Sequence, residues 1–328
     1  MKFLSKYALA TSIFTIFCSS PLLATELKVL SSWNKNIWPT YVVLDTFVKN
    51  VEKIGGGKVK LKISGPEVVP AFQQLQPVKS GVFDILFTHG AYHAGAKGLA
   101  VSIDAMLPDP VGKRLSGVWD KLDKFYQEAH GLKLLAAAPA STHGYHMFLK
   151  EPLSKSGDFQ GRKIRGTQTY FGVIKLLGGQ PVVLPGSQVY SALEKGVVDG
   201  AAWPSAGMLN MKHYEVAKHK IRPTFGTTHP PVFMNLKKYK SLTQANKSIL
   251  LSAGYQTELE MPWIGDALQA KEDSALAAKG VKITKLSSEK AAKLRKTFSE
   301  SLWKQGEKCC GSVANELRAL SEKAGLSQ

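Results

Sequence analysis

The chain has 328 residues and a formal charge of +18, from 43 Lys and Arg against 25 Asp and Glu. Hydrophobic residues make up 44% and charged residues 21%, which is typical of a globular protein and excludes disordered, collagenous and coiled-coil classes. Three cysteines are too few for a disulfide-dense scaffold. The length predicts roughly two domains, at about 150 residues each.

The first 24 residues have the pattern of a secretory signal peptide. Two lysines precede an apolar run from Tyr7 to Phe17, and a small residue stands at Ala24, where we expect cleavage. The apolar run is shorter than the about 20 residues needed to cross a bilayer, which disfavours a retained membrane anchor. A lipoprotein cut before Cys18 is disfavoured by the bulk of Phe17. We therefore expect an exported mature chain.

Processing would leave two cysteines, Cys309 and Cys310. Adjacent cysteines can close only a strained eight-membered ring, and disulfides prefer Cα atoms that are further apart. The sequence therefore predicts no structural disulfide. It also contains no CxxC motif or metal-type cysteine spacing.

The positive charge has two interpretations. Removing Lys2 and Lys6 lowers the formal charge from +18 to +16, a value often associated with nucleic-acid binding. The lysines are scattered along expected helix faces and strand edges, and the sequence contains no dense run of basic residues. We therefore expect solvated surface lysines and no nucleic-acid partner, with a field that attracts small anions.

Strands and helices alternate along the first half of the chain. Val59, Leu61 and Ile63 alternate with lysines, which is typical of a strand with one buried face. The expected strands are Leu27–Leu30, Lys58–Ile63 and Val82–Phe87, with helices following Thr40 and Pro70. This order predicts βαβ units and a mainly parallel sheet.

A second set of similar elements follows a helical stretch around Leu115–Ala129. The expected strands and extended segments are Leu132–Ala137, Gly144–Leu149, Lys163–Arg165, Val182–Leu184 and Val197–Trp203, and helices are expected over Tyr170–Leu177 and Ser187–Lys195. The second set resembles the first in kind but not in sequence. It predicts a second α/β domain.

The last third of the chain is mostly helical. From Thr243, a candidate N-cap, to Lys279 the pattern predicts one long helix with a kink at Pro262. Two amphipathic helices are expected after Ser287. Two α/β domains with crossing segments and a long helix predict a clamshell, in which the carboxyl ends of the strands face a shared cleft.

The chain contains none of the catalytic motifs for which we searched. No GxGxxG or P-loop follows the first expected strand, and no GxSxG is present. His89 and His93 have the spacing of a helical zinc pair, but they lack the HExxH glutamate and a third ligand. His143 and His146 face opposite sides of a strand, and acidic residues such as Asp104 show no paired spacing. We therefore expect no catalytic residues, no metal and no cofactor.

The most distinctive motif lies between residues 161 and 200. Residues 161–166 read GRKIRG, and residues 177–200 read LGGQPVVLPGSQVYSALEKGVVDG. This resembles the signature of the solute-binding proteins of TRAP (tripartite ATP-independent periplasmic) transporters, the DctP family. That signature is a GxKhR strand, where h is apolar, followed by lGa.pv.lp.sEvY.AL..GvvDG. Weaker resemblances cover nearly all of the mature chain, at Val78–Ile85, Val232–Thr243 and Ala278–Thr284.

The resemblance implies a fold and its division into domains. The expected fold is a two-domain periplasmic-binding-protein clamshell, similar to type II, with mainly parallel sheets and a long, kinked helix that bridges the domains. After the signal peptide, residues 1–24, domain I would comprise residues 25–143 with 232–268. Domain II would comprise residues 144–231 with 269–328, including the C-terminal helices.

The resemblance also implies a function. The chain would be a monomeric periplasmic receptor that binds an organic acid between its domains and delivers it to the small and large membrane subunits of a TRAP transporter. A secreted α/β enzyme acting on a small carboxylate remains an alternative, as does a binding module of another uptake or sensing system. The identity of the acid is left open.

Arg165 is the main candidate for ligand binding. In the family, the arginine of the GxKhR strand clamps the substrate carboxylate, and Arg165 has that position here. A guanidinium suits the role because it offers paired donors that match a carboxylate and stays charged when poorly hydrated. The alternative interpretation is a surface arginine or an internal ion pair.

Seven further residues are weaker candidates for ligand contact. Asn235 matches the family's asparagine in a strand that returns to the first domain, where a structural role is an equal alternative. Trp33 and Trp203 are expected to wall the cleft or to belong to the core. Phe72 and Gln73, at the head of an expected helix, and Tyr92, in a loop after a strand, have positions suited to ligand contact. Tyr145 lies where several relatives of the family place a polar or cationic substrate contact.

Departures from the family pattern restrict the class of ligand that we expect. Gln188 replaces the usual glutamate of sEvY. Sialic-acid binders carry a polar DGqEN stretch where this chain has DGAAW at 199–203, which disfavours a ligand with many hydroxyls. The 2-oxo-acid branch has a metal-binding glutamate before a tryptophan, whereas Ala202 precedes Trp203 here. A smaller or more apolar organic acid fits best.

Overall fold

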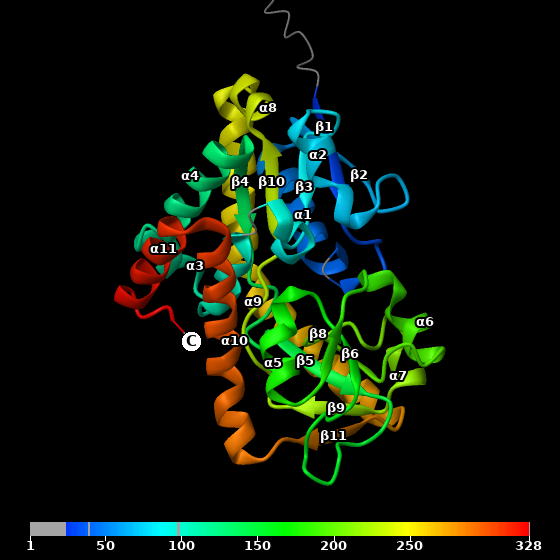
Figure 1. Ribbon diagram of the computed structural model, residues 1–328. Helices are drawn as coiled ribbons and strands as arrows, with labels where there is room; N and C mark the ends of the chain where they lie inside the picture. The colour runs from blue at the N-terminus through cyan, green and yellow to red at the C-terminus, as the bar shows by residue number, and fades with distance from the viewer. Residues whose placement is uncertain (1–23, 39, 97–98, 328) are drawn as a thin grey trace, which may run out of the picture.

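The computed structural model describes residues 24–38, 40–96 and 99–327. The first 23 residues of the expected signal peptide lie outside this part. The chain forms two α/β domains, one above the other in Figure 1, and each is built around one sheet. No helix in the described residues is long and apolar enough to cross a membrane.

The first domain contains a five-stranded sheet that is parallel except for one strand. Its order is β2 (Val59–Ser64), β1 (Thr25–Ser31), β3 (Ile85–Phe87), β10 (Pro231–Asn235) and β4 (Leu132–Ala137). β10 enters from the other domain and runs antiparallel to both neighbours. Helix α1 (Asp45–Gly55) packs on this sheet with Phe47 and Val51 fully buried.

The second domain contains a six-stranded sheet, also mixed. Its order is β11 (Lys282–Lys285), β9 (His219–Arg222), β5 (Tyr145–Leu149), β8 (Gly200–Pro204), β6 (Lys163–Arg165) and β7 (Gln180–Val182). β5 is the first strand after the chain crosses from the first domain, and it is antiparallel to β8 and β9. The expected clamshell with mainly parallel sheets is confirmed, and the antiparallel strands are those that follow an interdomain crossing.

The remaining helices are mostly short. The α-helices are α2 (Leu75–Lys79), α3 (Pro110–Leu115), α4 (Val118–His130), α5 (Phe171–Leu176), α6 (Val189–Glu194), α7 (His213–Val216) and α8 (Leu236–Ser241). The irregular helical segments are η1 (Thr40–Leu44), η2 (Ala71–Gln73), η3 (Gly90–Ala96), η4 (Leu99–Ala105), η5 (Gln168–Tyr170) and η6 (Gly186–Gln188).

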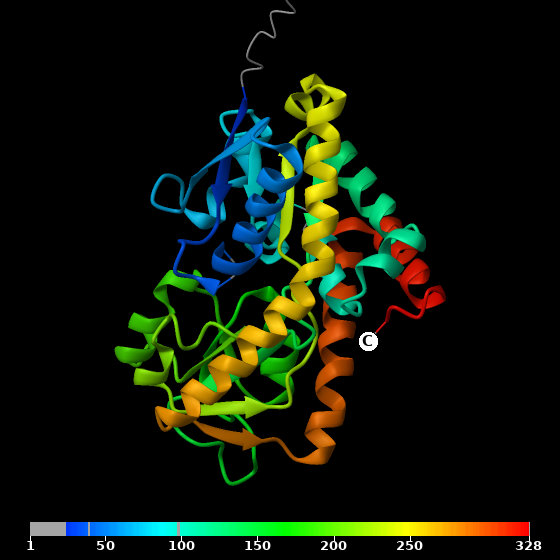
Figure 2. The ribbon, with the colours of Figure 1, turned by 180° about the vertical axis from the view of Figure 1, so that it is seen from behind.

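A single long helix, α9 (Gln244–Ala278), bridges the two domains. Its N-cap is Thr243, whose side chain accepts a hydrogen bond from the backbone N–H of Asn246. Pro262 lies inside it, and Figure 2 shows the helix bending as it passes from the upper to the lower domain. The predicted long, capped helix with an internal proline is confirmed.

The two C-terminal helices lie along the side of the molecule, and the longer one contacts both domains. α10 (Ser288–Cys310) contacts η4 of the first domain and α5 of the second, whereas α11 (Ser312–Lys323) packs against α4. Trp303 and Leu317 are buried in the same core as Leu122 of α4. β11 belongs to the second-domain sheet. The expected grouping of residues 269–328 with the second domain stays a prediction, because α10 contacts both domains.

Cys309 and Cys310 form a disulfide at the end of α10. The prediction of no disulfide was therefore wrong. The preferred Cα separation applies to bridges between separate segments, whereas these two residues, with Cα atoms 3.8 Å apart, close a ring through their own peptide bond.

Candidate ligand-binding cleft

A cavity lies between the two domains and is lined by residues of both. Its lining residues follow the carboxyl ends of β1, β3, β6 and β8, which is where open α/β sheets bind ligands. The first domain contributes Trp33, Ile37, His89 and Tyr92, the second contributes Tyr145, Arg165, Thr167, Tyr170, Trp203 and Pro204, and the β9–β10 crossing contributes Thr228 and Pro230.

Arg165 lies at the cavity with its side chain almost fully buried, at 2% exposure. Its Nε and Nη2 both donate to the Leu184 carbonyl, at 3.0 and 2.8 Å, and its Nη1 donates to the Ala202 carbonyl at 3.1 Å. A guanidinium has five N–H groups, so one remains on each terminal nitrogen. Among the described residues Arg165 has no carboxylate partner. The remaining pair is the fork that binds a carboxylate with two hydrogen bonds.

The backbone around Arg165 explains why the motif residues are needed. Arg165 is the last residue of β6, which pairs with β7 and β8 on either side. At Gly166, a Cβ would lie 2.7 Å from Ile174 Cδ1 and 3.1 Å from Tyr170 Cβ, so a larger residue there would require these neighbours to shift. The neighbouring strands therefore place the guanidinium, and the carbonyls of Leu184 and Ala202 hold it in one orientation.

On the first-domain side, Trp33 and Tyr92 form one aromatic wall. The Trp33 indole N–H donates to the Tyr92 hydroxyl at 3.0 Å, and the two rings lie 5.3 Å apart. The loop that carries Trp33 is anchored by Ser32, whose hydroxyl contacts Gln74 and Thr88 at 2.7 Å each. This wall is rigid and apolar, with one hydroxyl at its surface.

On the second-domain side, Trp203 lies against the guanidinium. The Arg165 guanidinium carbon is 5.3 Å from the centre of the Trp203 ring, within the range of a cation–π contact. Behind Trp203, His213 packs edge-on at 5.0 Å and stacks on Phe148. Among the described residues neither His213 ring nitrogen has a hydrogen-bond partner, and burial lowers the pKa of His213 to about 3.

The floor of the cleft is organised by Asp104, which is fully buried. One carboxylate oxygen accepts from His89 Nε2 at 2.8 Å and from the Tyr145 hydroxyl at 2.6 Å. The other accepts from the backbone N–H of His229 at 2.9 Å. Asp104 thus ties together the first domain, β5 of the second domain and the β9–β10 crossing.

The titration of this cluster follows from its burial. Burial alone would raise the pKa of Asp104, but the charge of His89 and hydrogen bonds from His229 and His89 outweigh it and lower the pKa to about 2. Burial, followed by the nearby Lys113, lowers the pKa of His229 to about 4. At neutral pH the floor therefore holds an ionised Asp104 surrounded by donors, and its contact with His229 is a hydrogen bond rather than an ion pair.

The cavity brings together five of the eight residues proposed from the sequence: Arg165, Trp203, Trp33, Tyr145 and Tyr92. Phe72 and Gln73 lie outside it, in a shallow outer groove with His93. Phe72 nevertheless contacts Tyr92 edge-on at 4.8 Å. Phe72 therefore supports the wall from outside, and neither residue lines the cavity.

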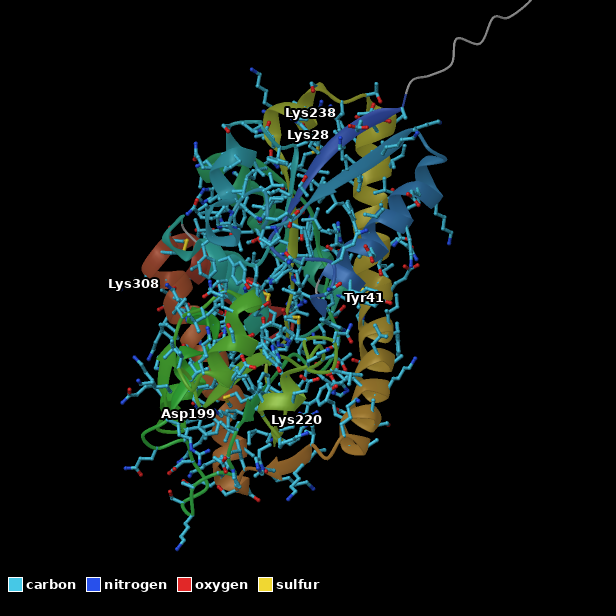
Figure 3. The ribbon with its side chains drawn as sticks, turned by 90° about the vertical axis from the view of Figure 1, so that its right-hand side faces the viewer. Lys28, Tyr41, Asp199, Lys220, Lys238 and Lys308 are labelled. Atoms are coloured by element: carbon cyan, nitrogen blue, oxygen red, sulfur yellow. A yellow bond between two sulfur atoms is a disulfide. The ribbon has the colours of Figure 1, made fainter. Side chains whose placement is uncertain are left out.

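Asn235 lies far from the cleft, at the opposite end of the first-domain sheet. Its side chain caps α8 by accepting from the Lys238 N–H and donates to the carbonyls of Val78 and Lys79. It shares an outer groove with Lys28 and Lys238, which Figure 3 shows at the outer end of that domain. We therefore replace its expected ligand contact with the structural alternative.

The sequence reasoning missed several residues of the cavity. Tyr170 heads α5 five residues after Arg165, and Thr167 lies between them. Thr228 and Pro230 belong to a Thr-Thr-His-Pro-Pro run at the interdomain crossing. Two signals in the sequence could have indicated these residues. Tyr170 follows a motif strand, and Thr228 and Pro230 lie in a Pro-rich crossing.

His89 and His93, which have the spacing of a helical zinc pair, contact other side chains. His89 Nε2 contacts Asp104, and His93 Nε2 lies 2.9 Å from the Thr88 hydroxyl. Within the described residues, no three His, Cys, Asp or Glu side chains are grouped to hold a metal.

A family model for bacterial extracellular solute-binding proteins, family 7 (DctP), matches residues 30–308 of the chain. The chain belongs to this family. The match includes every residue that lines the cleft, from Trp33 to Pro230. The expected resemblance to TRAP solute-binding proteins is thereby confirmed.

Relatives of this DctP-family chain include binders of organic acids. It is 25% identical over 277 residues to the monocarboxylate 2-oxoacid-binding periplasmic protein of a Nostoc species, covering 80% of this chain and 74% of that protein. A TRAP periplasmic solute-binding protein from Desulfovibrio salexigens with bound orotic acid has a TM-score of 0.79 at 21% identity, covering 91% of this chain and 98% of the other.

A second solved structure has the same fold. It is an extracytoplasmic solute receptor from Bordetella pertussis that binds pyroglutamic acid, with a TM-score of 0.77 at 16% identity, covering 91% of this chain and all of the other. At these identities the likeness shows the fold alone. The family and its solved members are solute-binding receptors rather than enzymes.

Proposed function

We propose that this DctP-family protein is a periplasmic receptor that captures an organic acid through Arg165 and delivers it to the membrane subunits of a TRAP transporter. The main support is the guanidinium of Arg165, which is buried at the cavity with one unused N–H on each terminal nitrogen. A desolvated arginine without a protein carboxylate partner requires an anionic ligand to offset the cost of its burial.

The chemistry of the cleft is binding rather than bond cleavage. Arg165 supplies charge and two directed donors, while the Trp33–Tyr92 wall and Trp203 supply rigid apolar surface. Because the lining residues come from both domains, closure around the acid would be a hinge motion of the clamshell. The acids bound by the Nostoc, Desulfovibrio and Bordetella relatives are of the same carboxylate class.

Calorimetry on the purified mature protein tests the assignment of Arg165. A set of small acids, such as pyruvate, lactate, butyrate and benzoate, would be titrated into wild-type protein and Arg165→Ala. Because each of the two hydrogen bonds from the charged fork contributes about 1.5–3 kcal/mol, the variant should lose at least roughly 100-fold in affinity. Arg162→Ala is the matched control, since Arg162 is half-buried outside the cavity and its hydrogen bonds in the described part go to the carbonyls of Glu151 and Pro152.

The delivery step has its own test. The receptor would be added to vesicles that contain the small and large membrane subunits, and uptake of the bound acid would be measured. Wild-type protein should support uptake and Arg165→Ala should not. Uptake that is the same with and without the receptor would contradict the transport assignment, and equal binding by Arg165→Ala would contradict the site.

A further inference from the structure

We infer that the cleft selects a planar acid with a single carboxylate and an apolar ring, such as an aromatic monocarboxylate. This inference rests on the proposed function, because it specifies the ligand class of the same site. It follows from three properties of the cavity: the number of cations, the state of the nearest carboxylate and the composition of the walls.

The cavity contains a single formal cation. Arg165 provides the donors for one carboxylate, and no Lys or other Arg lines the cavity in the described part of the chain. The His89 ring is not an available second donor, since its Nε2 contacts Asp104 and its Nδ1 accepts the Ala91 N–H. A second carboxylate would be buried against aromatic rings without a partner, which costs several kcal/mol.

The nearest acid cannot accept an ammonium group from the ligand. Asp104 is fully buried, and both of its oxygens already accept hydrogen bonds, from His89 and Tyr145 on one side and from His229 on the other. Asp104 is also absent from the lining of the cavity. An amino-acid zwitterion would therefore leave its positive charge without a counter-ion.

The walls are flat rings with few polar atoms. Trp33 and Tyr92 face the cavity from one domain, and Trp203 and Tyr170 face it from the other. Near Gly186 of the second domain the two domains approach closely, because a Cβ there would lie 3.5 Å from the Tyr92 hydroxyl of the first domain, and 3.0 Å from the Trp203 ring of its own domain. Such a slot favours an aromatic ring, which can stack at both faces, over a puckered ring or a polyhydroxylated chain.

The polar atoms that remain are hydroxyl groups. The Tyr92 hydroxyl accepts from Trp33, which leaves its own proton to donate, and the hydroxyls of Tyr170 and Thr167 are on the opposite side. These groups can satisfy one or two neutral oxygen or nitrogen atoms on a ring. They are too few for the several hydroxyls of a sugar acid.

Three pairs of acids test the inference by calorimetry on the wild-type protein. Benzoate against cyclohexanecarboxylate compares a planar ring with a puckered one. Butyrate against succinate adds a second carboxylate, and phenylacetate against phenylglycine adds an ammonium group. The first member of each pair should bind at least about tenfold more tightly, because the second leaves a ring unstacked or a charge unpaired.

A variant separates ring stacking from charge. Trp203→Leu should weaken benzoate binding about tenfold and butyrate binding much less, because butyrate has no ring to stack. Trp263→Leu is the matched control, since Trp263 is 79% exposed on α9 and away from the cleft. It should leave every affinity unchanged.

The possible failures are distinguishable. If succinate, phenylglycine or cyclohexanecarboxylate binds as tightly as its partner and Arg165→Ala abolishes that binding, the ligand class is wrong and the receptor function stands. If no carboxylate binds the wild-type protein, both the ligand class and the proposed function are overturned.

Discussion

The two walls of the cleft differ in the kind of binding energy that they can supply. The second-domain wall holds the charge, with Arg165 fixed by the carbonyls of Leu184 and Ala202. The first-domain wall, Trp33 and Tyr92, carries no formal charge and lies on the opposite side of the cavity. On the proposed function, we expect the second domain to provide most of the affinity for an acid and the first domain to provide shape complementarity on closure.

The largest expected effect comes from changing the charged wall without removing its charge. Arg165→Lys keeps a cation but loses the paired donors and the hydrogen bonds to two carbonyls. We expect affinity for a carboxylate to fall by about 2 kcal/mol, roughly 30-fold. Calorimetry measures this, and an affinity within a factor of two of wild type would show that the fork is not used.

A change at Gly186 tests contact between the walls. Its Cβ would lie 3.5 Å from the Tyr92 hydroxyl of the first domain, and the two methyl groups of a valine would extend beyond that, so Gly186→Val should hold the domains apart. We expect about a tenfold loss of affinity, since overpacking costs about 1–3 kcal/mol. Small-angle scattering should show the variant more open in the presence of ligand. Ser187→Val, at an exposed neighbour, should behave as wild type.

The pH dependence of stability should reveal the histidine behind the charged wall. Burial lowers the pKa of His213 from 6.5 to about 3. Below pH 6.5 the unfolded chain binds a proton at this position and the folded chain does not, so the unfolding free energy falls as the pH decreases from about 6.5 toward 3. Between pH 7 and pH 5 this one group should remove about 1–2 kcal/mol.

His213→Phe should reduce that loss, because phenylalanine can keep the contacts with Phe148 and Trp203 and does not titrate. Urea unfolding at pH 7 and pH 5 measures the difference. His143→Phe, at an exposed histidine, serves as the control. A steep pH dependence that persists unchanged in His213→Phe would exclude His213 as its source.

The smallest expected effect is on the uncharged wall. Tyr92→Phe removes the hydroxyl that accepts the Trp33 indole N–H. We expect about 1 kcal/mol, roughly fivefold, in ligand affinity, since a neutral hydrogen bond contributes about that much. Tyr41→Phe, at the exposed Tyr41 labelled in Figure 3, should have no effect. A loss from Tyr92→Phe equal to that from Arg165→Lys would contradict the proposed division between the walls.

The sequence alone predicted the elements whose cause is local. Strict alternation predicted β2, the run Leu132–Ala137 predicted β4 with its observed bounds, and Thr243 predicted the N-cap of α9. The family motif singled out Arg165 because its glycines and strand residues are adjacent in the chain. Periodicity, capping and motif spacing are properties of neighbouring residues, so no tertiary information is needed to recognise them.

The tertiary structure decided which side chains meet. Asn235 and Arg165 both end strands, yet Asn235 caps α8 at the far end of its sheet and only Arg165 reaches the cleft. Tyr170, Thr228 and the buried Asp104 come from segments that are distant in the chain and converge at the domain boundary. Their contacts depend on strand order, on the interdomain crossings and on the packing of α10 and α11, none of which is encoded by the spacing of adjacent residues.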